Sequence, residues 1–219
     1  MFGYFFIQWH SDEFCTFPAP FLHSWKRAMR RILPDPLYDA INGNTDSEHA
    51  FALLLDEIGD LDRELTSDEF ADALERTINR ITAMSRENRI VDASSMNFAV
   101  TDGRHVLATR CRNKVSETPP SLFYCLGTDC SGCGGRLGSV IISSEPLTKQ
   151  EGKWALVPSN HMLVIPFDAR KPDQVTNVLI RPLEIDEIDF RAPHESRQSR
   201  VITERGEGSD KEERSPFVA

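Results

Sequence analysis

The spacing of hydrophobic residues along the chain changes near residue 90. Upstream of that point, apolar residues recur every three or four positions, as they do along one face of an α-helix. The clearest helix is predicted over residues 46–58, where Gly59 would end it. Its apolar face consists of Phe51, Leu54, Leu55 and Ile58.

Two more helices are expected on either side of this one. A short basic helix should follow Ser24 over residues 25–32, and Pro34 and Pro36 should end it. Another helix should begin near Ser67, with its charged residues on a solvated face. The apolar face of that helix consists of Phe70, Leu74, Ile78 and Ile81.

Downstream of Arg89 the pattern favours β-strands. Asp102-Gly103 lies between two runs of strand-forming residues and predicts a hairpin turn. Helices that are followed by antiparallel strands indicate an α+β fold. The expected strands are Asn97–Thr101, His105–Arg110, Leu122–Leu126, Ser139–Ser143, a shorter Trp154–Val157, and Met162–Ile165.

Composition divides the 219 residues into three parts. Residues 1–22 are aromatic and have no clear period, and residues 23–185 carry the predicted domain. Residues 186–219 contain few large apolar side chains, so we expect a disordered tail there. The formal net charge of -9 argues against nonspecific binding to nucleic acids or anionic membranes, because both favour a basic surface.

The five cysteines are an odd number and lie mostly far apart, which argues against a secreted disulfide framework. The apolar first residues lack a basic start, and the acidic Asp12 and Glu13 follow them, unlike a signal peptide. No apolar run approaches the roughly 18 residues of a membrane span. These features predict a cytoplasmic protein.

The start of the helix at residue 46 carries the most informative motif. Thr45, followed three residues later by Glu48, predicts a capping box in which Glu48 accepts a hydrogen bond from the amide of Thr45. Asp46 then lies in the first turn. Its carboxylate either complements the helix dipole alone, worth about 0.3–1 kcal/mol, or binds a cationic ligand.

Three segments in this order together resemble the class II glutamine amidotransferases. The similar branch hydrolyses γ-glutamyl bonds and is typified by the yeast glutathione-degradation subunit. The resemblance covers about residues 24–166. The segments are Asn42–Phe51, Ser95–Gly103, and Ile142–Thr148 followed by Trp154–Asn160.

The resemblance implies a partial αββα sandwich of the N-terminal nucleophile hydrolases. In that family, a terminal cysteine attacks a γ-glutamyl carbonyl and its own α-amine acts as the base. An Asn-Gly pair stabilises the oxyanion, and an aspartate binds the substrate α-ammonium. The aspartate role falls on Asp46, which Thr45 and Glu48 would support.

The other family residues have no counterpart in this sequence. Residue 2 is Phe2 rather than cysteine, and no His-Asn-Gly run precedes Ser24. Cys15 would become a terminal nucleophile only after cleavage behind Phe14. We therefore expect an N-terminally truncated and inactive chain: a fragment or an incorrect gene model, or a short isoform, unless the resemblance misleads.

The resemblance also implies a substrate and a partner. The branch acts on glutathione in the cytosol, while other branches use glutamine. The yeast subunit works with a metallopeptidase-type partner, so the alternative function is a non-catalytic interaction subunit. No cofactor, nucleic acid or membrane is expected.

The remaining candidate residues have structural explanations. Cys130-Ser-Gly-Cys133 has metal or redox spacing, but a structural zinc site needs four ligands and no second such pair exists. Asn97 is expected to make a strand-start hydrogen bond or to support the site, and Asp102 to form the turn. Ser144-Glu145-Pro146 and His161 are expected to be structural.

Overall fold

The computed structural model describes residues 27–43, 45–90, 93–114, 116–127, 139–149, 152–166 and 178–186, and the backbone of residues 5–7. The predicted disordered tail beyond residue 186 lies outside the described residues, as do Cys15, Cys130 and Cys133.

Helices come first in the described chain and strands dominate after them. Residues 27–32 are helical, as predicted. The helices that follow are α2 (Asp35–Asp39), α3 (Asp46–Ile58) and α4 (Ser67–Glu87). The strands are β1 (Phe5–Ile7), β2 (Ala99–Thr101), β3 (His105–Arg110), β4 (Phe123–Leu126), β5 (Val140–Ser143), β6 (Ala155–Leu156), β7 (His161–Pro166) and β8 (Leu179–Pro182).

The two long helices begin and end where the sequence indicates. Thr45 caps α3 and accepts a hydrogen bond from the amide of Glu48, and Gly59 ends the helix with a φ of 74°, a conformation that favours glycine. One expectation was wrong. Pro36 does not only end the preceding helix but lies in the first turn of α2, where its fixed φ and missing N–H are tolerated.

The larger sheet has five strands in the order β1-β2-β3-β7-β8, and every neighbouring pair is antiparallel. β3 and β7 form its centre and pair along their full lengths, from His105 opposite Pro166 to Arg110 opposite His161. β1 comes from the segment that the sequence marked as atypical, yet it pairs with β2.

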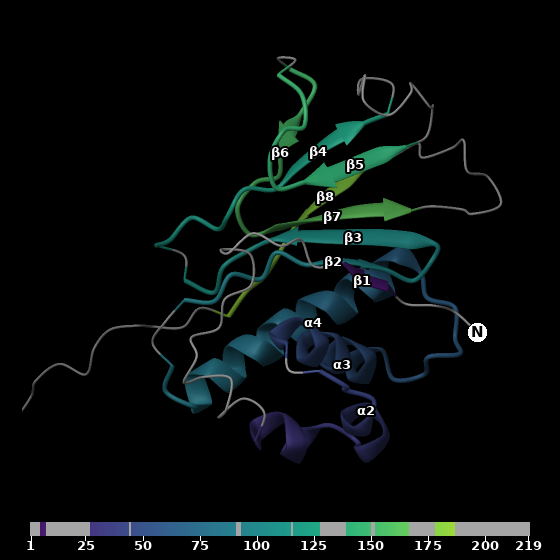
Figure 1. Ribbon diagram of the computed structural model, residues 1–219, viewed down its shortest axis with the longest axis vertical. Helices are drawn as coiled ribbons and strands as arrows, with labels where there is room; N and C mark the ends of the chain where they lie inside the picture. Colours follow the sequence, from purple (N-terminus) through teal and green to yellow (C-terminus); the bar gives the residue numbers. More distant parts are fainter. Residues whose placement is uncertain are drawn as a thin grey trace, which may run out of the picture.

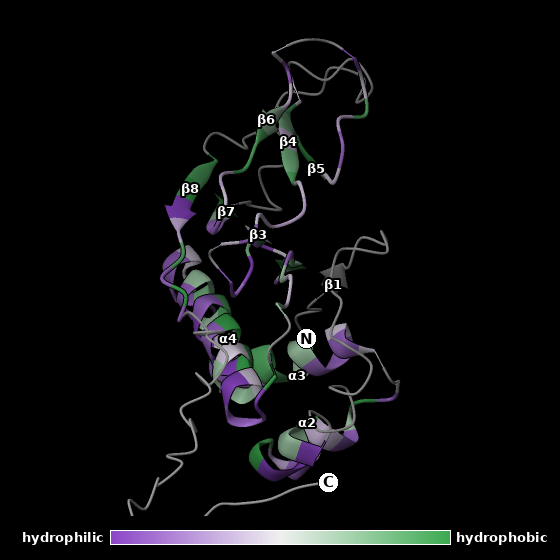
Figure 2. Cartoon of the chain, turned by 90° about the vertical axis from the view of Figure 1, so that its left-hand side faces the viewer, coloured by the Kyte–Doolittle hydropathy of each residue, from purple (hydrophilic) through white to green (hydrophobic). Residues whose placement is uncertain are grey.

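A second, antiparallel sheet has the order β5-β4-β6. In Figures 1 and 2 the helices lie at the bottom, the larger sheet lies in the middle, and β4, β5 and β6 lie at the top. The described residues thus supply one helical layer and two sheets. The predicted α+β class, as part of an αββα sandwich, is confirmed.

Each side of the larger sheet faces its own hydrophobic core. Leu107 and Met162 point to the core that α3 and α4 cover. Ala108 and Leu163 point to the core shared with the smaller sheet. Since side chains alternate along a strand, the central strands are buried on both faces, as strands between two layers must be.

The strand predictions succeeded except at the two edges of the larger sheet, β1 and β8. β3 was predicted with its observed bounds, whereas β8 was not predicted. Its sequence, Leu179 to Pro182, is short and ends in a proline, and both its leucine and isoleucine are exposed. Those are features of an edge strand, which gives a weak sequence signal. Within the described ranges, no helix is long and apolar enough to cross a membrane.

Candidate functional site

The N-terminus of α3 carries the residue that the sequence marked as a ligand. Asp46 is the first residue of the helix and is half-buried. Its Oδ1 accepts hydrogen bonds from the amide of Ser47 at 2.8 Å and from the Ser47 hydroxyl at 3.3 Å. Among the described residues, no group donates to Oδ2. One oxygen therefore holds the carboxylate in place, and the other can accept from a ligand.

Glu48 supports this helix start differently from the prediction. Its Oε1 accepts hydrogen bonds from the amides of Asn42 and Gly43, each at 2.9 Å, rather than from the amide of Thr45. Only the Thr45 half of the predicted capping box forms. A Cβ on residue 43 would collide with Glu48 Oε2, so the glycine lets the loop approach the carboxylate.

A complete capping box does occur, but at the start of α4. The Thr66 hydroxyl accepts from the amide of Glu69, and Glu69 Oε2 accepts from the amide of Thr66 at 2.9 Å. The carboxylate also accepts from Arg63 and from the Thr66 hydroxyl. The bonds to the carboxylate, led by the one from the Thr66 amide, lower the pKa of Glu69 to about 2. The Glu48 carboxylate reaches further upstream because the loop before α3 lies against it.

His49 belongs to the same helix start and was missed by the sequence reasoning. Its ring is buried, at 3% exposure, and Nδ1 lies 2.7 Å from the carbonyl oxygen of Thr45. The sequence does contain a signal for this contact. His49 lies four residues after the cap residue Thr45, and a residue at that position in a helix lies next to the carbonyl of the cap.

The second motif has a structural role. Asn97 is buried, its Oδ1 accepts from the amide of Cys111 at 3.1 Å, and its Nδ2 donates to the carbonyl of Pro120 at 3.1 Å. Its side chain thus completes the ladder between the chain before β2 and the chain after β3. The expectation of a hydrogen bond at the strand start describes this arrangement.

Asp102 organises the hairpin turn, as the sequence indicated. Its Oδ1 accepts from the amides of Arg104 and His105, and its Oδ2 lies 2.9 Å from His105 Nδ1. Burial raises the pKa of this carboxyl, but the hydrogen bonds, chiefly from the His105 ring, outweigh it and leave the pKa below its usual value.

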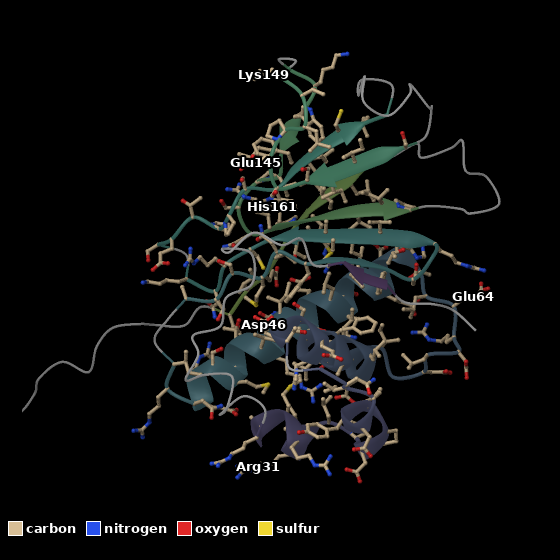
Figure 3. All side chains as sticks on the ribbon, in the orientation of Figure 1. Arg31, Asp46, Glu64, Glu145, Lys149 and His161 are labelled. Carbon is tan, nitrogen blue, oxygen red and sulfur yellow. The ribbon has the colours of Figure 1, made fainter. Side chains whose placement is uncertain are left out.

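The third motif lies apart from Asp46. In Figure 3, Glu145 lies beside the upper sheet, well separated from Asp46 at the helical end, and it is exposed. The carbonyl of Ser144 accepts from the hydroxyl of Ser121 at 2.8 Å. His161 starts β7, and its Nδ1 lies 2.8 Å from the carbonyl oxygen of Ser159. Both predictions of structural roles agree with these contacts.

Neither of the two described cysteines is arranged as a nucleophile. Cys111 is fully buried, and burial raises the pKa of its thiol far above the usual value. Cys125 lies in β4, as predicted, and is disulfide-bonded, a bond that the cysteine spacing did not predict. Its partner lies outside the described residues. Within the described ranges, no three His, Cys, Asp or Glu side chains are grouped as a metal site.

The buried Arg110 binds backbone carbonyls. Its guanidinium donates to three carbonyls, those of Pro119, Pro120 and Val157, at 3.1, 2.9 and 2.7 Å. Burial lowers its pKa. These three bonds join two loops to β3.

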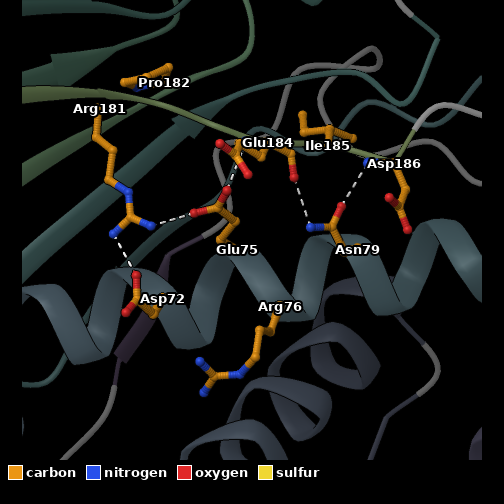
Figure 4. Close-up of a pocket in the computed structure, with 9 residues that line it drawn as sticks. All are labelled: Asp72, Glu75, Arg76, Asn79, Arg181, Pro182, Glu184, Ile185 and Asp186. Atoms are coloured by element: carbon orange, nitrogen blue, oxygen red, sulfur yellow. Dashed lines mark hydrogen bonds and ion pairs between the residues drawn. The ribbon is translucent and has the colours of Figure 1, made fainter.

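A pocket of about 700 Å³ lies between α4 and the chain that follows β7 (Figure 4). Asp46 is not among its lining residues. Arg181 is bound there to Asp72 at 2.7 Å and to Glu75 at 2.6 Å. These contacts join β8 to the helix, so the polar groups at the centre of the pocket already have partners.

No family model matches the chain. The probable glutamine amidotransferase DUG3 of Saccharomyces cerevisiae is 29% identical over 202 aligned residues, which cover 83% of this chain and 54% of the yeast protein. The predicted resemblance to the class II glutamine amidotransferases is confirmed. The glutamine amidotransferase-like chain spans about half the length of this curated relative.

Solved structures agree on the fold. The glutamine aminotransferase class-II domain protein from Silicibacter pomeroyi superposes with a TM-score of 0.56 at 22% identity, over 82% of this chain and 67% of that chain. The predicted glutamine amidotransferase from Pseudomonas aeruginosa PA01 has a TM-score of 0.40 at 14% identity, over 82% and 58%. The second similarity is too low to carry an argument.

Proposed function

We propose that this glutamine amidotransferase-like chain binds the α-ammonium group of a γ-glutamyl compound through Asp46. The observation that carries the proposal is the half-buried Asp46 carboxylate, which is held by Ser47 through one oxygen. A charge-assisted hydrogen bond from an ammonium to the other oxygen would be of the stronger kind. The resemblance to an amidotransferase supports a γ-glutamyl ligand.

We further propose that the chain as written binds such a ligand without cleaving it. A cysteine nucleophile needs an accessible thiolate. Of the two described cysteines, Cys111 is buried with a raised pKa and Cys125 is disulfide-bonded. The amides of Asn42 and Gly43, the Asn-Gly pair nearest the helix, donate to Glu48 and are not free to bind an oxyanion.

The test is calorimetric titration of the purified chain with L-glutamine and with glutaramate, which lacks the α-amine. We expect L-glutamine to bind more tightly than glutaramate. Asp46→Asn should weaken L-glutamine binding by about tenfold or more, since the charge of the acceptor is lost. Glutaramate binding should change little.

A matched control is Asp68→Asn, which removes an exposed carboxylate from the first turn of α4. It should leave L-glutamine binding unchanged. Equal affinities of the wild-type chain for L-glutamine and glutaramate would refute ammonium recognition. Release of glutamate from either L-glutamine or glutathione by the purified chain would refute the proposed lack of hydrolysis.

We propose cytosolic glutathione as the substrate of an amidotransferase that has this chain's site together with the catalytic cysteine. The γ-glutamyl group of glutathione carries the same α-ammonium and α-carboxylate as glutamine. If the site serves glutathione, titration with glutathione should show an affinity at least equal to that for L-glutamine, and Asp46→Asn should weaken both. Binding of L-glutamine but not of glutathione would instead indicate an amidotransferase that uses glutamine in small-molecule synthesis.

The alternative is a non-catalytic subunit that binds a peptidase-type partner. Exposed large apolar side chains favour it: Leu126, Leu147 and Leu156, at 43%, 62% and 48% exposure, belong to the smaller sheet and its neighbouring loop. Replacing all three by serine should abolish co-purification with a coexpressed metallopeptidase, while Asp46→Asn should not. Loss of the complex with Asp46→Asn alone would contradict this alternative.

A further inference from the structure

The first turn of α3 contains an unusual hydrogen-bond arrangement at His49. In a regular helix, the amide of residue 49 would donate to the carbonyl of residue 45 at about 2.9–3.0 Å. Here the distance between these two atoms is 3.5 Å. The imidazole Nδ1 of His49 lies only 2.7 Å from the same carbonyl oxygen. The side chain therefore makes the bond that the backbone makes only weakly.

This contact determines which ring nitrogen carries a proton. A carbonyl oxygen can only accept, so Nδ1 must donate, and in the neutral ring Nε2 is then the unprotonated nitrogen. Burial at 3% exposure holds the ring in a single position. His49 is thus a buried donor aimed at the carbonyl of the cap residue.

The carbonyl that His49 holds belongs to the peptide unit that joins Thr45 to Asp46. A peptide unit is planar, so fixing its oxygen also fixes the direction of the Asp46 N–Cα bond. Thr45 Oγ1 accepts from the amide of Glu48 on the other side of the same residue, at 3.3 Å. Two side-chain bonds thus set the peptide that presents the Asp46 carboxylate.

We propose that His49 is a positioning residue, which aims Asp46 at the ligand ammonium by holding the Thr45 carbonyl. The inference rests on the proposed function for its ligand, but the hydrogen bond itself can be tested without one. His49 does not touch the ligand in this scheme, and it acts only through the Thr45–Asp46 peptide.

The first experiment reads the ring directly. Long-range ¹H–¹⁵N NMR spectra of the ¹⁵N-labelled chain at pH 8, above the usual range of histidine pKa values, report which nitrogen of each histidine is protonated. We expect His49, assigned by comparison with His49→Asn, to be protonated at Nδ1. Protonation at Nε2, or averaging between the two nitrogens, would overturn the inference.

The second experiment uses a matched pair of variants, His49→Asn and His49→Leu. The two replacements have the same shape, but the asparagine Nδ2 takes the place of the histidine Nδ1 and can donate to Thr45, whereas leucine cannot. We expect His49→Asn to keep the preference for L-glutamine over glutaramate, and His49→Leu to lose it by about tenfold. Thermal unfolding of both variants gives the purely structural effect.

The outcomes separate the two proposals. If His49→Leu lowers stability but keeps the ammonium preference, His49 is only a packing residue and the inference is wrong. If the wild-type chain itself shows no ammonium preference, the proposed function fails and the binding role of His49 fails with it. The NMR spectrum would then still decide whether His49 holds the Thr45 carbonyl.

Discussion

At the scale of single residues, buried polar side chains near the end of β3 bind backbone groups rather than one another. Thr109 donates to the carbonyl of Met96 at 2.7 Å and accepts from the amide of Phe98 at 2.9 Å. Asn97 and Arg110 likewise bind backbone groups. Because these bonds satisfy buried carbonyls and amides, each replacement would leave an unsatisfied group at a cost of about 1–3 kcal/mol.

Cys111 gives a prediction that can be tested by chemical labelling. Its thiol is fully buried, donates to the carbonyl of Met96 at 3.2 Å, and has a raised pKa because of burial. We expect no reaction of Cys111 with iodoacetamide in the native chain at pH 8, and rapid reaction in denaturant, by peptide mass spectrometry. Labelling of the native chain would contradict the buried position.

At the scale of elements, residues 181–186 form a strap that is attached to α4 by side chains (Figure 4). Glu75 accepts from the amide of Glu184 at 2.7 Å. Asn79 donates to the carbonyl of Glu184 at 2.8 Å and accepts from the amide of Asp186 at 2.9 Å. One amide side chain thus pairs with an extended backbone as a neighbouring strand would.

Removing this attachment should release the strap while leaving α4 folded. Asn79→Leu loses both bonds, and Asn79→Asp keeps the acceptor but loses the donor. With about 0.5–1.5 kcal/mol for each bond, we expect Asn79→Leu to lower the free energy of unfolding by about 1–2 kcal/mol and Asn79→Asp by less. Hydrogen exchange of the amides of Glu184 and Asp186 should become faster.

Unchanged exchange of those two amides in Asn79→Leu would show that strand pairing with β7 and the bond from Glu184 to Glu75, not Asn79, hold the strap. Asn88→Leu is a suitable control, because Asn88 Nδ2 donates only within its own helix, to Met84 at 2.8 Å. That variant should not change exchange in the strap.

At the scale of the whole molecule, the two hydrophobic cores share β3 and β7. Leu53 lies in the core beneath the helices and Leu163 in the core between the sheets, and both are fully buried. Neither core can lose its central strands without exposing the other. We therefore expect the described domain to unfold as one unit.

Leu53→Ala and Leu163→Ala should each lower the free energy of unfolding by about 2–5 kcal/mol, as large-to-small core replacements do. Denaturant unfolding followed by circular dichroism and by tryptophan fluorescence should give coincident transitions for both variants. Two separate transitions in either variant would show that the cores unfold independently.

The sequence predicted the elements whose signals are local. α3 and α4 begin at threonine caps and have periodic apolar faces, so capping and periodicity were enough to predict them. β7 was predicted because a short continuous apolar run indicates a strand that is buried on both faces. β8 was not predicted because it is a short edge strand with exposed apolar residues, and because its attachment to α4 joins distant parts of the chain. α2 was not predicted because Pro34 and Pro36 were interpreted only as the end of a helix.

At the candidate site, the sequence predicted the helix start and only part of its hydrogen bonding. Thr45 and Asp46 could be placed from the motif, since a cap fixes the first turn. The partners of Glu48 depend on how the loop at Asn42 and Gly43 folds back, which the motif does not encode. The contact between the His49 ring and the Thr45 carbonyl could not be predicted without the geometry of the helix start.

The double burial of β3 and β7 has a consequence for how the sequence encodes strand alignment. Where one face of a strand is solvated, a slip by one residue exposes apolar side chains and is strongly disfavoured. A slip of Met162-Leu163-Val164-Ile165 would only exchange one buried set for another. The alignment information must therefore reside in the polar neighbours, Thr109 and Arg110, whose bonds to fixed carbonyls allow a single alignment. Apolar residues of matching volume could be exchanged within this run at little cost, whereas replacing Thr109 or Arg110 would remove the bonds that mark the alignment.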